Sequence, residues 1–315
     1  MRGLLHIYFC GVVRLWGEII MNADVAKCLI TDTFNDLRID KFNVLGQGKA
    51  GSICLVNGEI VFKIPLYKDE EIAMWQRNEA EVLKFLEGKT DIEIPKIIYE
   101  AESEDGAFIF GETYLPGKSL TYEMFDEYFT KPEQNDVYRQ LGEIVRNLHD
   151  VGGNDPSWLT YGDIETPEEM IDEFYGRFTT DVRNVFSNDE IMKIENIVVH
   201  YKTISQEHPV KPVLCHHDLH IGNFMFDIET KKITGMLDFG CAGYTEPARD
   251  WHYYFDTTFV LEGYGKVDDI YFSDRQRFHA LSWSLNNLSE EIAEDKKSYP
   301  YLGYIRDYIL VCGTG

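Results

Sequence analysis

The stretch HHDLHIGN occupies residues 216–223, and LDFG follows at residues 237–240 after two short apolar segments. Together they place three oxygen-bearing side chains, Asp218, Asn223 and Asp238, on loops beside short strands. This donor set suits magnesium, a hard cation that takes a few protein oxygens and completes its octahedron with phosphate and water. Asp218 is also a candidate to accept a proton from a hydroxyl group that attacks a phosphoryl group. The two stretches therefore predict a site for phosphate chemistry.

Each part of this pattern has a simpler explanation when it is taken alone. Asp-Phe-Gly is compatible with an ordinary turn, and His-x-Asp with a capped loop. His216, His217 and His220 invite a zinc site, but they share one loop and are not joined by a second cluster such as H-E-x-x-H. The combination is much harder to explain in this way than any part alone. His-x-Asp is followed by Asn223, and then by Asp-Phe-Gly after an intervening pair of apolar strands.

A glycine-rich segment, LGQGKAG at residues 45–51, lies between two predicted strands. It fits G-x-G-x-x-G through Gly46, Gly48 and Gly51, so that backbone amides approach phosphate oxygens without interference from Cβ atoms. An ordinary hairpin loop fits the same residues. Because the segment leads into a strand and not into a helix, it argues against a dinucleotide-binding fingerprint.

Lys63 lies within the apolar strand VFKIP at residues 61–65. An ammonium group in such a strand needs a counter-charge. Glu79, in the helix predicted after this strand, is the natural partner, and the ion pair would direct the lysine at the α- and β-phosphates of a nucleotide. Glu71 and Glu81 are competing partners, and Lys63 extending to solvent is a further alternative.

The first part of the chain is rich in predicted strands, which cover residues 39–45, 53–56, 60–64, 94–99 and 107–115. Asn57-Gly58 predicts a hairpin, because both residues tolerate positive φ. Helical spacing of apolar residues over 69–86 predicts one long helix, which ends before Gly88.

The pattern changes at Leu115-Pro116-Gly117. Helices are predicted at residues 136–150, 167–186, 189–207, 247–261 and 274–294, and a short β segment at 213–216, 224–227 and 233–237. We therefore expect an α+β fold of two lobes. The N-lobe, residues 22–115, would bind a nucleotide, and the C-lobe, residues 116–315, would carry the catalytic and acceptor-binding groups.

The chain is strongly acidic. Its 315 residues include 30 Lys and Arg against 54 Asp and Glu, a formal net charge of −24 at pH 7. This charge excludes nucleic-acid binding held by bulk electrostatics. It is compatible with a cationic substrate drawn into an acidic cleft, and equally with a surface that keeps the protein soluble.

Residues 1–21 are predicted to be an N-terminal extension, with Met21 as an alternative start. The apolar stretch at 3–13 is similar to a secretory signal, but Arg14 and Glu18 interrupt it and no clean cleavage site follows. The stretch is also shorter than the roughly 20 apolar residues of a membrane span. The six scattered cysteines contain no C-x-x-C pair, which favours reduced thiols and a cytoplasmic location.

Taken together, these residues resemble the aminoglycoside phosphotransferase group of the protein-kinase-like superfamily, which also holds choline, homoserine, methylthioribose and macrolide kinases. The resemblance runs from about Ile39 to Leu261 and is strongest at residues 216–223, at 237–240 and at YTEPARDW, residues 244–251. It implies a bilobal protein-kinase-like fold with a small antiparallel-sheet N-lobe and a mainly helical C-lobe. Asp250, in the last of these stretches, is expected to order a loop.

The resemblance also implies roles for single residues. Asp218 would be the catalytic base or the group that orients the hydroxyl. Asn223 and Asp238 would be the ligands of Mg²⁺, and Lys63 with Glu79 would position the phosphates of ATP or GTP.

Two features separate the chain from protein kinases. His217 replaces the arginine of His-Arg-Asp, and the chain runs from Asp238 to Pro247 with too little length for an activation segment. A helical insert before the catalytic loop is common in the small-molecule branch of the superfamily, and residues 167–207 would supply it and wall the substrate site. His217 also departs from the small or polar residue more usual there, but no catalytic group is lost.

The leading acceptor is an aminoglycoside antibiotic, a hydroxylated polycation. The carboxylates considered for its ammonium groups are Asp256, Glu262, Asp268, Asp269, Glu168, Glu169, Asp172 and Glu173, each of which is also explained as a solvated helix face. Four aromatic residues, Trp251, Tyr253, Tyr254 and Trp283, are candidates for stacking on a sugar or caging a quaternary amine, and equally for the core.

Two other functions stay open. The first is a kinase of a metabolite such as choline, homoserine or a sugar, using the same site. The second is a catalytically silent nucleotide-binding protein, against which the intact Lys63, Asp218, Asn223 and Asp238 argue. We expect no nucleic-acid or membrane partner, and the sequence indicates no protein partner.

Overall fold

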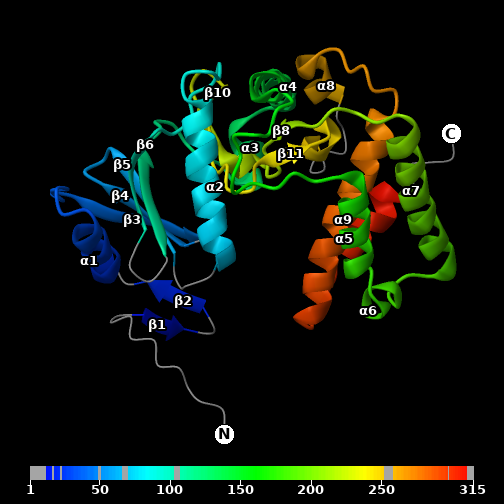
Figure 1. Ribbon diagram of the computed structural model, residues 1–315, viewed down its shortest axis with the longest axis horizontal. Helices are drawn as coiled ribbons and strands as arrows, with labels where there is room; N and C mark the ends of the chain where they lie inside the picture. Colours follow the sequence, from blue (N-terminus) through cyan, green and yellow to red (C-terminus); the bar gives the residue numbers. More distant parts are fainter. Residues whose placement is uncertain are drawn as a thin grey trace, which may run out of the picture.

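The computed structural model describes residues 12–15, 18–21, 23–48, 51–65, 70–102, 107–251, 258–296 and 298–310. These residues form a lobe built around a five-stranded sheet and a second lobe that is mainly helical (Figure 1). The bilobal α+β arrangement predicted from the sequence is confirmed.

The N-lobe sheet is antiparallel, in the order β3-β4-β5-β7-β6. Its strands are β3 (Phe42–Gly48), β4 (Gly51–Val56), β5 (Ile60–Ile64), β6 (Ile97–Glu102) and β7 (Phe108–Thr113). The predicted hairpin between β4 and β5 is confirmed, because Asn57 and Gly58 adopt φ of 56° and 78° at its turn.

Two strands begin three residues later than predicted, each for a local reason. β3 begins at Phe42 and not at residue 39, because the Asn57 side chain holds residues 38–41 around the turn by three hydrogen bonds to their backbone. β6 begins at Ile97 and not at residue 94, because Pro95 has no N–H to donate to a strand ladder.

The two faces of the sheet have different partners. Cys54, Phe62 and Ile109 pack on one face with α1 (Ala23–Thr33). Side chains alternate along a strand, so Val61 and Lys63 point from β5 to the opposite face. Lys63 meets α2 (Glu70–Leu86) there, and in Figure 1 this helix stands between the sheet and the C-lobe.

The C-lobe consists of helices around two short β pairs. The helices are α3 (Tyr122–Tyr128), α4 (Lys131–Gly152), α5 (Pro167–Arg177), α6 (Thr180–Arg183), α7 (Asn188–Glu207), α8 (Thr258–Tyr264), α9 (Phe272–Ala293) and α10 (Pro300–Tyr304), with helical turns η1 (Ile221–Asn223), η2 (Pro247–Trp251) and η3 (Ile305–Ile309). The antiparallel pairs are β8 (Val213–Cys215) with β11 (Gly243–Thr245) and β9 (Phe224–Asp227) with β10 (Lys232–Met236).

Two separate hydrophobic cores stabilise the C-lobe. The main core joins Leu83 of α2 to Leu141 of α4 and Phe239 of the 237–240 stretch, so it spans both lobes. A second core packs Phe174 of α5 and Tyr201 of α7 against α9. The predicted helical insert therefore shares its apolar centre with α9 and η3, at the right of Figure 1.

Two predicted helices differ from the structure by more than two residues or by a break. The single helix at 167–186 is divided, because Phe178 leaves helical geometry and Thr179 adopts an extended conformation before α6. The helix predicted to begin at residue 136 starts at Lys131, where Pro132 occupies the first turn and Thr130 forms a capping box with Glu133. In the range predicted as a helix at 247–261, the described residues form the helical turn η2 and the start of α8, which continues to Tyr264; residues 252–257 lie outside the described part.

Within the predicted N-terminal extension, residues 12–15 and 18–21 form a small antiparallel hairpin, β1 (Val12–Leu15) with β2 (Glu18–Met21). Among the described residues, no helix combines the length and apolar character needed to cross a membrane. The cysteines among the described residues are free thiols: Cys28, Cys54, Cys215 and Cys241.

Glycines allow α4 and α8 to approach closely, which gives a test of this packing. A Cβ on Gly142 would lie 2.0 Å from the Val260 carbonyl oxygen. We expect Gly142→Ala to destabilise the protein by about 1–3 kcal/mol through overpacking, although alanine is the better helix former.

The matched control is Gly176→Ala in α5, where a Cβ meets nothing within 4 Å. Alanine there should leave stability unchanged or raise it by up to about 1 kcal/mol. Urea unfolding of both variants measures the difference, and equal stabilities would contradict the close contact.

Candidate active site

The residues predicted from the sequence gather between the lobes. A cavity of about 350 Å³ is lined by Gly51, Lys63, Glu79, Asp218 and Asp238, among others. A second cavity of about 480 Å³ shares Lys63 and Asp238 and adds Gly46 and Asn223. Gly48 pairs with Gly51 near the end of the β3–β4 hairpin, and residues 49–50 lie outside the described part.

Lys63 is held by two acidic side chains. Its Nζ lies 2.5 Å from Glu79 Oε1 and 3.5 Å from Asp238 Oδ1. Burial opposes the charge on Lys63, but Glu79 and Asp238 outweigh it and raise the pKa of the lysine above its usual value. The same charge lowers the pKa of Asp238, so both groups stay ionised at neutral pH.

The alternatives for Lys63 are resolved by these contacts. Its side chain is 14% exposed and paired, so it does not extend to solvent. Glu81 accepts hydrogen bonds from the backbone N–H groups of Thr160 and Tyr161, and is thereby committed elsewhere. Glu79 is the partner that the structure selects.

Helix α2 also anchors the 237–242 segment. The Phe239 backbone N–H donates to Glu79 Oε1 at 3.3 Å, and Asn78 Nδ2 donates to the carbonyl oxygens of Gly240 and Ala242. Asn78 was not predicted from the sequence, and its only signal was a polar residue on the buried face of the helix.

Asp218 and Asn223 face each other across the 216–223 loop. Asn223 Nδ2 donates to Asp218 Oδ2 at 2.9 Å and to the Asp218 carbonyl oxygen at 2.8 Å. His216 Nδ1 accepts from the Asp218 N–H, and its Nε2 lies 2.8 Å from the Leu237 carbonyl oxygen. These two bonds fix the tautomer with the proton on Nε2 and tie the 216–223 loop to the 237–240 stretch.

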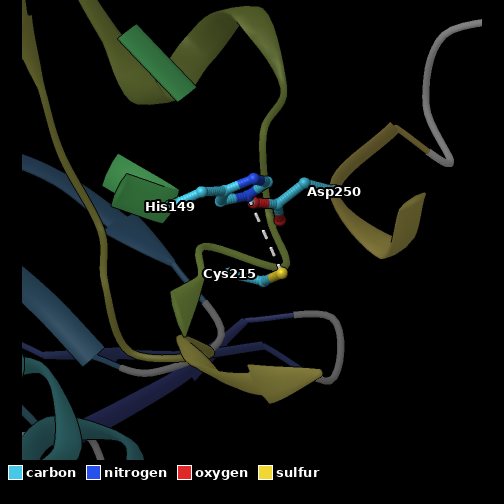
Figure 2. Close-up of side chains that lie close together, drawn as sticks. All are labelled: His149, Cys215 and Asp250. Atoms are coloured by element: carbon cyan, nitrogen blue, oxygen red, sulfur yellow. Dashed lines mark hydrogen bonds and ion pairs between the residues drawn. The ribbon is translucent and has the colours of Figure 1, made fainter. Parts of the chain in front are cut away.

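Asp250 orders this loop, as predicted. It is fully buried and accepts from the backbone N–H groups of His216 and His217 at 3.0 and 2.7 Å. Figure 2 shows it facing His149 of α4, whose Nε2 lies 3.0 Å from Asp250 Oδ2. Burial raises the pKa of a carboxyl, but hydrogen bonding and charge from His149 outweigh it and hold the pKa of Asp250 well below its usual range.

Metal binding by the histidines is not favoured. Within the described residues, the cluster with metal-like spacing is His149, Cys215 and Asp250, not the histidines of the 216–223 loop (Figure 2). Its atoms already have partners, since His149 Nδ1 meets the Tyr264 hydroxyl at 2.8 Å and Nε2 meets Asp250. Burial raises the pKa of the Cys215 thiol, which opposes the thiolate that a metal requires.

Several acidic side chains proposed for a cationic acceptor already have partners within the chain, most of them at the protein surface. Glu262 pairs with Arg139, Asp268 with Lys266, Asp269 with Arg275 and Glu173 with Arg177, while Glu169 forms the capping box of α5. Asp256, Tyr253 and Tyr254 lie outside the described residues. Trp251 is buried in the main core, which was the alternative to stacking on a ligand.

A different acidic group lies beside the 216–223 loop. Glu165 Oε2 is 3.9 Å from Nε2 of His217, the neighbour of Asp218. Burial and the charges of Glu165 and two carboxylates of α5 raise the pKa of Asp163. Burial lowers the pKa of His217 to about 4, so this imidazole does not neutralise Glu165 at pH 7. Arg249 does pair with it, since its Nε lies 3.7 Å from Glu165 Oε2. Asp163 and Glu165, here called the acidic pair, were not predicted from the sequence.

Comparison with known proteins gives a consistent result. A family model described as the phosphotransferase enzyme family matches residues 55–277, well over half of the chain. The chain is similar in structure to the GDP and kanamycin complex of APH(2″)-IIIa, at 20% identity and a TM-score of 0.77, covering 91% of this chain and 99% of the other.

It is also similar to the gentamicin complex of APH(2″)-IIa, at 18% identity and a TM-score of 0.67, with 94% and 98% covered. The macrolide 2′-phosphotransferase MphH of Brachybacterium faecium matches at 16% identity and a TM-score of 0.66, with 93% and 99% covered. At such identities these structures establish a shared fold.

The role of Asp250 can be tested by its removal. Asp250→Ala leaves two buried N–H groups and His149 without their acceptor, and we expect a loss of about 3–5 kcal/mol in unfolding free energy at pH 7. Because its folded-state pKa is depressed, the contribution of Asp250 is present above about pH 4 and fades as the pH falls further. The deficit of the variant should therefore shrink below pH 4; urea titrations at several pH values measure it, and a constant deficit would contradict this account.

Proposed function

This chain belongs to the phosphotransferase enzyme family, and from that premise we propose that it transfers the γ-phosphate of ATP or GTP to a hydroxyl group of an aminoglycoside antibiotic. The observation that carries the proposal is the convergence of Lys63, Glu79, Asp218 and Asp238 on one cavity between the lobes. Phosphoryl transfer needs a cation on the phosphates and a carboxylate at the attacking oxygen, and this cavity contains both.

Asp218 is the proposed catalytic residue. Its carboxylate accepts a hydrogen bond from Asn223, which holds it in one orientation toward the cavity. Lys63, kept charged by Glu79, would contact the phosphates and offset the negative charge that develops during transfer.

The remaining donors fit Mg²⁺. Asp238 supplies a carboxylate that is 53% exposed, and Asn223 has an amide carbonyl oxygen left after its N–H groups bind Asp218. These are the hard oxygen ligands that Mg²⁺ prefers. When bound, the cation would supply positive charge that offsets the charge of the nucleotide phosphates.

Gly46, Gly48 and Gly51 would cover the phosphates from the β3–β4 hairpin. Gly51 has φ of 151°, and a Cβ there would lie 2.0 Å from the Ile64 carbonyl oxygen. A side chain at this position would therefore displace β5, the strand that carries Lys63.

The proposed acceptor rests on charge and on the neighbours. Two structures with the same fold are complexes with kanamycin and gentamicin. The chain carries a net charge of −24, and Glu165 lies beside the loop of Asp218, with Asp163 two residues before it. Because Arg249 already pairs with Glu165, an ammonium group of an aminoglycoside would bind at the exposed Asp163. A macrolide is the second candidate, because the fold also matches a macrolide 2′-phosphotransferase.

The acceptor class is tested by Mg²⁺-dependent nucleotide consumption with ATP and with GTP, on a panel of kanamycin, gentamicin, erythromycin, choline and homoserine. We expect turnover with an aminoglycoside. Turnover confined to choline or homoserine would replace the acceptor, and binding of nucleotide without any turnover would favour a catalytically silent protein.

Replacing the catalytic carboxylate tests the mechanism. Asp218→Asn should lower kcat about 10²–10⁴-fold, because the amide cannot accept the hydroxyl proton, and should leave the nucleotide Kd within about threefold. Asp227→Asn, on the neighbouring strand β9, is the matched control and should retain activity. Full activity of Asp218→Asn would overturn the assignment.

Removing one charge of the acidic pair tests the acceptor site. Asp163→Asn should raise KM for kanamycin about tenfold with little change in kcat, because a charge-assisted hydrogen bond to an ammonium group is lost. Asp181→Asn in α6 removes the same charge at the far end of the insert and should leave KM unchanged. Equal KM values in both variants would place the acceptor elsewhere.

A further inference from the structure

The cavity of about 480 Å³ has mainly apolar walls, contributed by both lobes. Val61 and Leu45 line it from the sheet, Met225 and Leu237 from the C-lobe, and Leu115 from the segment that connects the lobes. Such a cavity suits a flat aromatic ring, and it adjoins the proposed phosphate-binding residues Lys63 and Asp238. On the proposed function, this is where the base of the nucleotide would lie.

Most of the polar side chains on its walls are already occupied. Lys63 pairs with Glu79 and Asp238, the Thr113 hydroxyl accepts from Lys96 N–H, Lys118 bonds the Tyr128 hydroxyl, Ser119 bonds the Gly222 carbonyl oxygen and Asn223 bonds Asp218. These groups satisfy one another within the protein. They leave little to distinguish one base from another.

Glu112 is different. It lies on β7 directly opposite Val61, and only 4% of the residue is exposed. Its Oε2 is buried without a hydrogen-bond partner among the described residues, while the nearby Lys63 is held by Glu79 and Asp238. A buried carboxyl oxygen without a partner is costly, and a ligand that donates to it would repay that cost.

The protonation of Glu112 defines what it can recognise. Burial raises its pKa to about 8 against the opposing charge of Lys63, so the carboxyl holds its proton at pH 7. A protonated carboxyl offers one donor and one acceptor side by side. Adenine matches this pair with its 6-amino group and N1, and guanine matches it with O6 and N1–H in the opposite order.

We propose that Glu112 recognises the hydrogen-bonding group at C6 of a purine base and is a specificity-determining residue for the nucleotide. The proposal rests on the proposed nucleotide-dependent transfer. It accounts for a buried acid, on an otherwise apolar wall, that the phosphate-handling residues do not use. It also predicts that both 6-amino and 6-oxo purines are accepted.

The test varies both the side chain at position 112 and the group at C6 of the base, and compares the resulting nucleotide affinities. Binding of ATP, GTP and purine riboside 5′-triphosphate, which carries only hydrogen at C6, is measured with Mg²⁺ by titration calorimetry on the full chain. Wild type should bind ATP and GTP about tenfold more tightly than the purine analogue, since one buried hydrogen bond is at stake. In Glu112→Leu this ratio should fall to within about threefold.

Two further variants sharpen the result. Glu112→Gln keeps one donor and one acceptor and should retain the tenfold ratio. Glu100→Leu, an exposed glutamate on β6 of the same sheet, is the control for charge removal and should also retain it. The ratio cancels any general effect of a more apolar cavity on all three nucleotides.

The outcomes separate the two proposals. If wild type binds the purine analogue as tightly as ATP and GTP, the role of Glu112 is overturned without any variant, even if Glu112→Leu fails to fold. An unchanged ratio in a folded Glu112→Leu overturns it as well, and leaves the phosphotransfer proposal intact. If wild type binds none of the three nucleotides, it is the proposed function that fails.

Discussion

The ion pair between Lys63 and Glu79 is the contact on which the arrangement of the site depends. It joins β5 to α2, and Glu79 at the same time accepts the Phe239 N–H from the segment that carries Asp238. One carboxylate thus connects the sheet, the helix and the C-lobe. A buried charge pair is a weak source of stability, but breaking one leaves an uncompensated charge, so this contact strongly favours a single relative position of the three elements.

A second buried carboxylate does the same for the other half of the site. Asp250 holds the backbone of the loop that presents Asp218, and His149 of α4 holds Asp250. Asp250 and His149 can affect phosphoryl transfer without contacting a substrate, because the rate of such a reaction depends on where the charges of the site are held. The main core, which includes Leu83 of α2, Phe239 and Leu214 of β8, joins the elements that carry both anchors.

The general chemistry and the choice of ligands lie in different parts of the molecule. Family membership and the converging Lys63, Asp218 and Asp238 bear on phosphoryl transfer itself. The proposed acceptor site lies near the helical insert, which packs with α9 and η3 in a core separate from the main one. Solved structures with this fold include complexes with kanamycin and gentamicin and a macrolide 2′-phosphotransferase, so one fold is found with different acceptors.

Local patterns in the sequence were sufficient to predict several elements of the fold and most of the candidate site residues. The Asn57-Gly58 hairpin, the strand with Lys63 and the order of Asp218, Asn223 and Asp238 follow from residue types within a few positions of one another, because turn and strand preferences act over that range. Only the tertiary structure decided that Glu79 and not Glu81 meets Lys63, that His149 meets Asp250, and that Glu112 Oε2 is buried without a hydrogen-bond partner among the described residues. Those outcomes depend on which helix face packs on which strand, between residues 16 to 101 positions apart, and no short-range preference contains that information.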